Sequence, residues 1–115
     1  MTAYALARLQ PTAAPHPDVA TYIERIQETF EPFGGRFLVH GVTPERIEGE
    51  WEGDVVLVAF PDLAAAHAWY ASPAYQEILP LRTAHLPGEL IFLPGVPAGY
   101  DAATTAAALR AALPA

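Results

Sequence analysis

The sequence is marked first by the residues that it lacks. It contains no cysteine, which excludes disulfide bonds, a thiolate nucleophile and a zinc–thiolate site. It also contains no lysine, so Schiff-base chemistry is excluded. The single serine, Ser72, stands directly before Pro73, where it is expected to cap a helix. A Ser-His-Asp hydrolase is therefore not expected.

Charge and hydropathy narrow the classes of partner. The net charge of −7 reflects 13 acidic residues against six arginines, which are scattered along the chain. Phosphate binding needs clustered cations, so we expect no nucleic-acid partner. No apolar run reaches the ~18 residues of a membrane span, and the N-terminus lacks the basic and apolar regions of a signal peptide. We expect a cytoplasmic protein that does not contact a membrane.

Residues 54–82 organise the predicted fold. An apolar strand, Val55–Phe60, leads into a helix start at Pro61-Asp62, and Ser72-Pro73 begins a second short helix. The strand has almost no polar residue, which in an antiparallel sheet indicates that both faces are covered. Helices on one side can cover only one face, and a second copy of the sheet is the simplest cover for the other. The sequence therefore predicts a homodimer, which also suits its 52% apolar content.

The remaining segments complete a ferredoxin-like order, β-α-β-β-α-β, in an α+β fold with an antiparallel sheet. We expect further strands at Ala3–Leu9, Arg36–His40 and Glu89–Leu93, and a helix that begins at Pro17 and ends before Pro32. Residues 45–51 also alternate, and we expect them to form a hairpin with the central strand. Pro73 and Pro80 are each expected to restart a short helical turn.

Side-chain periodicity predicts which residues share a face. On the strand after Gly35, alternation places Arg36, Leu38 and His40 on one side and Phe37 and Val39 on the other. On the helix capped by Asp62, it places Leu63, Ala66 and Tyr70 toward the sheet. The domain is expected to span residues 1–97. The tail, residues 98–115, should form an Ala-rich helix that docks weakly, because its only large apolar residues are Leu109 and Leu113.

Four groups of residues carry a family resemblance: GGRFLVHG (34–41), EGEW (48–51), FPDLAAAHAWYASPAYQEI (60–78) and Arg82. With these, residues 3–96 resemble the proteins catalogued as domain-of-unknown-function family 1330, within the dimeric α+β-barrel superfamily. Asp18 and Tyr22 also match positions where the family tends to place these residue types, whereas members often carry arginine in place of His40. The resemblance implies a ferredoxin-like fold whose sheets face one another across a two-fold axis. It implies no reaction, although the superfamily includes cofactor-independent monooxygenases, muconolactone isomerases and haem enzymes.

Candidate site residues fall into two groups. His40 is a candidate catalytic acid or base, with Arg36 in register as an anchor for an anionic ligand. The alternative is a structural histidine at the dimer seam. Trp69, Tyr75 and Arg82 are candidate ligand-binding residues between the helices and the sheet. Alternatively, the aromatic residues belong to the core, together with Tyr70, and Arg82 caps a helix or pairs with Glu77.

No metal or cofactor is expected from sequence motifs. The glutamates at 45, 48, 50 and 52 are best interpreted as a solvated strand edge. The histidines at 16, 40, 67 and 85 never fall three or four residues apart, so no local metal motif exists. The glycines form neither a dinucleotide-binding motif nor a phosphate-binding loop.

Three functional hypotheses follow. The first is a homodimer that binds a small anionic or aromatic molecule between its helices and sheet, with cofactor-free catalysis by His40 and either Arg36 or Arg82 as anchor. The second is a non-catalytic dimeric module whose aromatic residues only stabilise the fold. The third is a haem-dependent enzyme. The sequence does not decide whether the chain is an enzyme.

Overall fold

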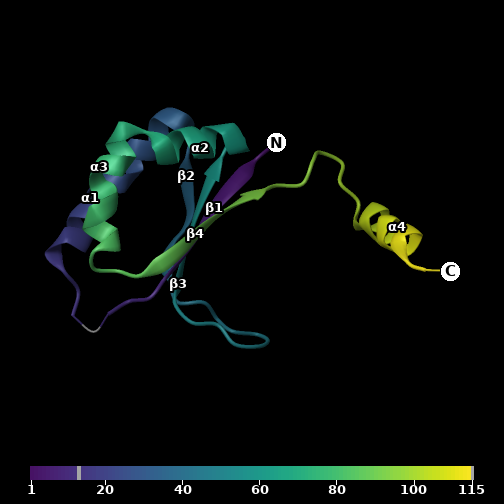
Figure 1. The fold of residues 1–115 in the computed structure, drawn as a ribbon, viewed down its shortest axis with the longest axis horizontal. Helices are drawn as coiled ribbons and strands as arrows, with labels where there is room; N and C mark the ends of the chain where they lie inside the picture. Colours follow the sequence, from purple (N-terminus) through teal and green to yellow (C-terminus); the bar gives the residue numbers. More distant parts are fainter. Residues whose placement is uncertain (13, 115) are drawn as a thin grey trace.

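The fold is built on one four-stranded sheet with helices packed against one of its faces (Figure 1). The computed structural model describes residues 1–12 and 14–114. The elements along the chain are β1 (Ala3–Leu9), α1 (Pro17–Phe30), the 3-10 helix η1 (Glu31–Phe33), β2 (Arg36–Val42), β3 (Asp54–Phe60), α2 (Leu63–Ala71), α3 (Pro73–Thr83), β4 (Gly88–Pro94) and α4 (Ala102–Ala112).

Strand order confirms the predicted ferredoxin-like α+β fold. The order across the sheet is β2-β3-β1-β4, and every neighbouring pair is antiparallel. β1 lies inside the sheet and pairs along its whole length with β3 and β4. Helices α1, α2 and α3 cover the face that carries Ala3 and Ala5, whose small side chains let the helices approach closely. Among residues 1–12 and 14–114, every helix is too short or too polar to span a lipid bilayer.

Helix boundaries follow from local capping groups. Asp62 caps α2, as predicted, by accepting a hydrogen bond from the Ala65 N–H at 2.8 Å. Ser72 caps α3 in the same way through the Tyr75 N–H at 3.3 Å. The expectation that Pro80 restarts a separate turn is wrong, because α3 continues through it to Thr83. A proline inside a helix removes one backbone hydrogen bond, and here the surrounding packing tolerates that loss.

The core lies between the three helices and the sheet. Its largest fully buried side chains are those of Phe30, Phe60, Tyr75 and Ile78. Trp69 is also buried, with 2% of its surface exposed, whereas Tyr70 is 37% exposed. The predicted inward orientation of Tyr70 is therefore wrong: the helix buries the position three residues after Ala66, not four. In place of Tyr70, the Trp69 ring packs in the core and its Nε1–H donates to Thr29 Oγ1 at 3.0 Å.

β2 contains a bulge that overturns the predicted alternation of its side chains. Its register shifts between Phe37 and Val39, so that Leu38 is an extra residue. The pairs on either side of the shift are Arg36↔Ala59, Phe37↔Val58, Val39↔Leu57 and His40↔Val56. Because directly opposed residues share a face, Phe37 and His40 face the helices, whereas Arg36 and Val39 face away. A second irregularity follows at Gly41, whose φ of 64° suits glycine, and the strand continues to Val42 instead of breaking there.

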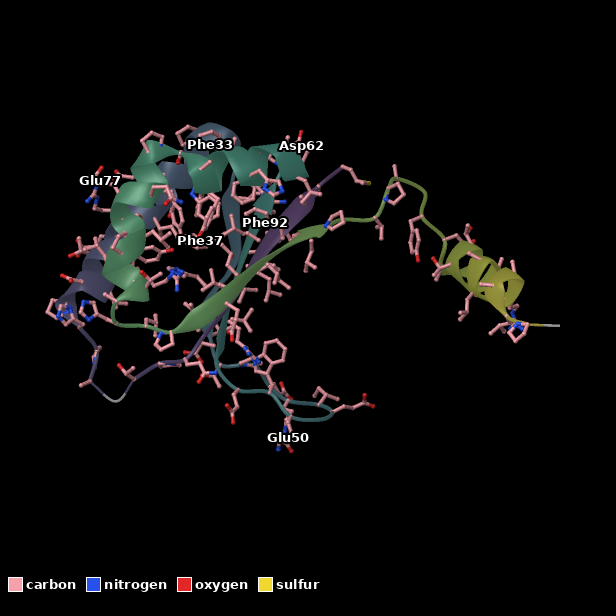
Figure 2. All side chains as sticks on the ribbon, viewed as in Figure 1. Phe33, Phe37, Glu50, Asp62, Glu77 and Phe92 are labelled. Atoms are coloured by element: carbon pink, nitrogen blue, oxygen red, sulfur yellow. The ribbon has the colours of Figure 1, made fainter. Side chains whose placement is uncertain are left out.

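The loop between β2 and β3 replaces the strand expected at residues 45–51, and that expectation is wrong. β3 pairs with β2 itself, and residues 43–53 form an irregular loop. Thr43 Oγ1 donates to Asp54 Oδ1 at 2.8 Å and closes the base of the loop. Nearer the tip, which Figure 2 marks with Glu50, Arg46 Nη1 pairs with Glu50 Oε2 at 3.0 Å. The alternating glutamates are therefore loop residues, not a strand edge.

The second face of the sheet carries no helix among the described residues. The charged residues Arg8, Arg36 and Glu89 lie toward the ends of that face. Between them the strand register places the apolar side chains of Tyr4, Leu6, Val39, Val42, Val55, Leu57, Ile91 and Leu93. We call this set the open face. Ile91 is 50% exposed and Leu93 is 40% exposed. A single chain therefore leaves uncovered the face for which the sequence predicted a partner.

The tail leaves the body of the domain after β4. Asp101 caps α4, as predicted, by accepting a hydrogen bond from the Ala103 N–H at 2.9 Å. None of the residues of α4 is buried, and Figure 1 shows the helix standing away from the sheet. The helix α4 therefore contributes no buried side chain to the core of its own chain.

Candidate functional site

A cavity of about 230 Å³ lies between the helices and the covered face of the sheet. Most of its lining is apolar, from β1 and β3 on one side and from α1 and α3 on the other. In Figure 2 the Phe37 side chain points into the region between sheet and helices that contains this cavity. Five of the lining residues have polar side-chain groups that matter for ligand chemistry: Tyr22, His40, Asp54, Tyr75 and Arg82.

Two buried tyrosines meet at the helical side of the cavity. Tyr22 comes from α1 and Tyr75 from α3, and their hydroxyl oxygens lie 2.9 Å apart. Burial raises the pKa of Tyr22, and the nearby Tyr75 raises it further. Burial also raises the pKa of Tyr75. Both hydroxyls therefore stay protonated at neutral pH. One of them donates to the other, and the second keeps a proton that it can donate to a ligand.

Arg82 places a cation beside this tyrosine pair. Its guanidinium carbon is 5.9 Å from the centre of the Tyr22 ring, and Nη1 donates to the Leu86 carbonyl at 3.4 Å. The positive charge of Arg82 opposes the rise in pKa of both tyrosines. Across residues 1–12 and 14–114, no carboxylate lies within ion-pair distance of Arg82, and Glu77 pairs instead with Arg25 at 3.7 Å. The alternative Arg82–Glu77 pair is therefore not formed.

His40 borders the cavity from β2. Its ring stacks on Phe37, with 4.1 Å between centroids and 14° between the ring planes. The histidine itself is exposed, so its imidazole lies where the cavity meets solvent. Asp54, on the neighbouring strand, borders the cavity as well. The site thus has a buried polar end, formed by Tyr22, Tyr75 and Arg82, and a solvent-facing end that carries the imidazole.

The structure brings together four of the five residues proposed from the sequence. His40, Trp69, Tyr75 and Arg82 all line the cavity. Arg36 does not, because the bulge in β2 turns it to the opposite face of the sheet from His40. An anchoring role for Arg36 next to His40 is therefore inconsistent with the strand register.

Sequence reasoning gave no functional role to Tyr22 and Asp54. Tyr22 belongs to the apolar stripe of α1, and helical periodicity predicts a core residue at such a position. Only the packing of α1 on α3 brings its hydroxyl to Tyr75. The family resemblance did single out Tyr22, and it was the one signal available for that residue.

The cavity is small for a large cofactor and has few side chains that could ligate one. Its volume is below the roughly 300–1,000 Å³ of typical small-molecule and cofactor sites. His40 is its only histidine among the described residues. The geometry therefore gives the haem hypothesis no support, and it favours a ligand smaller than most cofactors.

Comparison with solved structures identifies the fold. The RPA0582 protein of unknown function from Rhodopseudomonas palustris has 24% identity and a TM-score of 0.64, covering 84% of this chain and 83% of that one. SnoaB, a cofactor-independent oxygenase from Streptomyces nogalater, has 17% identity and a TM-score of 0.58, covering 87% and 98%. A dimeric ferredoxin-like protein of unknown function from Jannaschia sp. CCS1 has 16% identity and a TM-score of 0.57, covering 83% and 100%. At these identities the likeness establishes the fold alone.

Sequence comparison identifies the family. No curated protein matches the chain. The family model described as "Domain of unknown function (DUF1330)" matches residues 2–96, which include every strand and the three helices that pack on the sheet. The chain therefore belongs to the DUF1330 family.

Proposed function

We propose that this protein is a homodimer in which each chain binds one small aromatic molecule with an anionic or hydroxyl group in the cavity between its helices and sheet. The observation that carries the proposal is the contrast within the cavity. Its walls are apolar, whereas its buried end holds the Tyr22 and Tyr75 hydroxyls beside Arg82, a cation with no carboxylate partner among residues 1–12 and 14–114.

The buried polar end suits an anionic or electron-rich oxygen. Because one hydroxyl of the tyrosine pair donates to the other, the pair can donate one hydrogen bond to this oxygen, and the guanidinium supplies charge and further donors. Hydrogen bonds to charged groups are worth about 1.5–3 kcal/mol each. The apolar side chains, among them Val56 and Val58, favour a ligand whose remaining surface is flat and apolar. The small volume limits that part to about one or two rings.

His40 is the residue to which we assign proton transfer. It stands at the solvent-facing end of the cavity, and imidazole is the side chain best suited to move a proton near neutral pH. If His40 moves a proton to or from the bound molecule, the protein can catalyse a reaction on that molecule without a cofactor, and this is the extension that we propose. SnoaB, described as a cofactor-independent oxygenase, shares the fold and supports the extension by analogy only.

The open face supports the dimer. It is a contiguous set of apolar side chains that includes Ile91 and Leu93, both well exposed in one chain. Exposed apolar patches of this kind mark interaction surfaces. The Jannaschia protein of the same fold is described as dimeric, which supports a second copy as the occupant. Because the open face and the cavity lie on opposite sides of the sheet, both can be used at once.

The binding proposal is tested by calorimetry with salicylate and 1-naphthoate as probes. Arg82→Gln removes the cation from the cavity, and Arg110→Gln makes the same change on the exposed helix α4. We expect saturable binding to the wild type and to Arg110→Gln, and affinity at least about tenfold lower for Arg82→Gln. Equal affinity of the two variants would refute the assigned anchor. If neither probe nor any retained small molecule binds, the non-catalytic dimeric module becomes the better account.

A further inference from the structure

A second group of side chains meets outside the cavity, at the start of α1. His16 is the residue before the helix, Asp18 is in its first turn, and His85 follows α3. His85 Nε2 lies 3.1 Å from Asp18 Oδ2, and His16 Nδ1 lies 3.6 Å from the same oxygen. One side-chain atom of each residue lies within 4.8 Å of the other two. Two segments 67 residues apart in the chain thus bring two imidazoles to one carboxylate.

The atoms in this group are mainly electron-pair donors. His16 Nδ1 accepts a hydrogen bond from the Asp18 backbone N–H at 3.0 Å, so it presents a lone pair and not a proton. The same nitrogen lies close to the Asp18 carboxylate, which presents lone pairs too. No arginine of the described chain pairs with Asp18. A proton on His85 Nε2 can satisfy Asp18 Oδ2, but it leaves His16 Nδ1 and this oxygen facing each other as two acceptors. A metal ion between the three residues would bind the lone pairs of all of them.

We propose that His16, Asp18 and His85 form a binding site for a divalent transition-metal ion of the zinc and cobalt class. Two imidazole nitrogens and a carboxylate oxygen are a donor set that such ions prefer. A tetrahedral ion with bonds of roughly 2.0–2.1 Å holds its ligand atoms roughly 3.4 Å apart. The separations of 3.1 and 3.6 Å around Asp18 Oδ2 lie on either side of that value.

Binding needs one local rearrangement. The rings of His16 and His85 are stacked, with 3.5 Å between centroids and 6° between planes, and lone pairs of parallel rings cannot both point at one ion. One ring must rotate about its Cβ–Cγ bond, and His16 Nδ1 then releases the Asp18 amide to water. The side chains have room for this, since His16 is 44% exposed, Asp18 45% and His85 27%. Partial exposure also leaves space for water in the remaining coordination positions.

The position of the group gives the ion a structural effect. It would link the connector after β1 to the loop before β4, two segments that already meet where the Gln10 N–H donates to the Pro87 carbonyl at 2.9 Å. Val19 and Leu86, which follow Asp18 and His85 in the sequence, line the cavity. A bound ion would therefore fix the relative position of the two segments that form one end of the cavity. The metal proposal rests on His16, Asp18 and His85 and does not depend on whether the cavity binds a small molecule.

The site is tested by titrating Co²⁺ and Zn²⁺ into the full chain without a purification tag. Visible absorption reports Co²⁺ coordination and calorimetry reports Zn²⁺ binding. We expect one ion per chain, and an affinity at least about tenfold lower for His16→Ala, Asp18→Asn and His85→Ala. His67→Ala is the matched control, because His67 lies on α2 against Phe92, away from the group.

A second readout separates loss of binding from loss of folding. Zn²⁺ should raise the melting temperature of the wild type and of His67→Ala, and should leave that of His85→Ala unchanged. The metal-free melting temperatures of the variants show whether they still fold. The proposal is overturned if the wild type binds neither ion, if His85→Ala binds as tightly as the wild type, or if His67→Ala loses as much affinity as the three ligand variants.

Discussion

The hydroxyl oxygens of Tyr22 and Tyr75 lie 2.9 Å apart, in a buried position between α1 and α3. This one hydrogen bond ties together the two helices that form the helical wall of the cavity. It also sets the chemistry of the cavity's buried end, because both phenols are kept protonated where Arg82 adds a positive charge.

Removing one hydroxyl of the tyrosine pair should destabilise the fold. Tyr75→Phe leaves the buried Tyr22 hydroxyl without its partner, which is expected to cost about 1–3 kcal/mol in the free energy of unfolding. Urea denaturation measures this value. Tyr70→Phe, on a half-exposed ring, should change stability by less than about 0.5 kcal/mol.

A double-mutant cycle isolates the bond itself. Tyr22→Phe/Tyr75→Phe removes both partners, and its cost should be smaller than the sum of the two single costs because no buried hydroxyl is left unpaired. Strictly additive costs would show that the two hydroxyls do not interact.

The same pair predicts a loss of stability at alkaline pH. The pKa of each tyrosine is raised above the roughly 10 of an unfolded chain, so the native state holds protons that the unfolded state releases. Stability from these groups is therefore complete below about pH 10 and falls as the pH rises beyond it. Urea denaturation between pH 8 and 11.5 should show a smaller decline for Tyr22→Phe/Tyr75→Phe than for the wild type. Parallel curves would contradict the raised pKa values.

His40 should matter to the ligand and little to the fold. The residue is exposed, and His40→Ala loses only its stacking on Phe37, which is worth about 0.5–1.5 kcal/mol. We expect a small change in the denaturation midpoint together with weaker probe binding. A large loss of stability with unchanged binding would make His40 a structural residue.

The open face should control assembly. Light scattering is expected to give the wild type twice the 12.3 kDa mass of one chain at micromolar concentration. Ile91→Arg places a charge on the open face and should give a monomer, because a buried unpaired charge is strongly unfavourable. Ile47→Arg makes the same change in the exposed loop and should leave the dimer intact. A wild-type monomer would refute the dimer.

The fold was largely predictable because strong local signals agreed with one another. Apolar strands bounded by proline and glycine, and the caps Asp62 and Ser72, located almost every element. The errors have specific physical causes. Residues 45–51 alternate in polarity without pairing, since β2 already occupies that edge of β3. Pro80 fits inside α3, although proline alone predicts a break.

The site was predictable in its residue types but not in its arrangement. Periodicity cannot reveal a bulge, and the bulge at Leu38 alone decides that His40 faces the cavity while Arg36 faces away. Trp69 and Tyr70 are neighbours on α2, and only tertiary packing, which includes the hydrogen bond to Thr29 and the contact with Phe60, selects Trp69 for the core. The His16–Asp18–His85 group joins distant segments, and a search for local spacing has no means of finding it.

Native mass spectrometry of the gently purified protein tests the central claim, a ligand anchored by Arg82 in the cavity of each subunit. We expect a dimer that carries a discrete small molecule, either as purified or after incubation with salicylate and 1-naphthoate. Arg110→Gln should keep this extra mass and Arg82→Gln should lose it. A ligand anchored by Arg82 is refuted if Arg82→Gln retains the molecule as fully as the wild type, or if the wild-type dimer stays empty under both conditions.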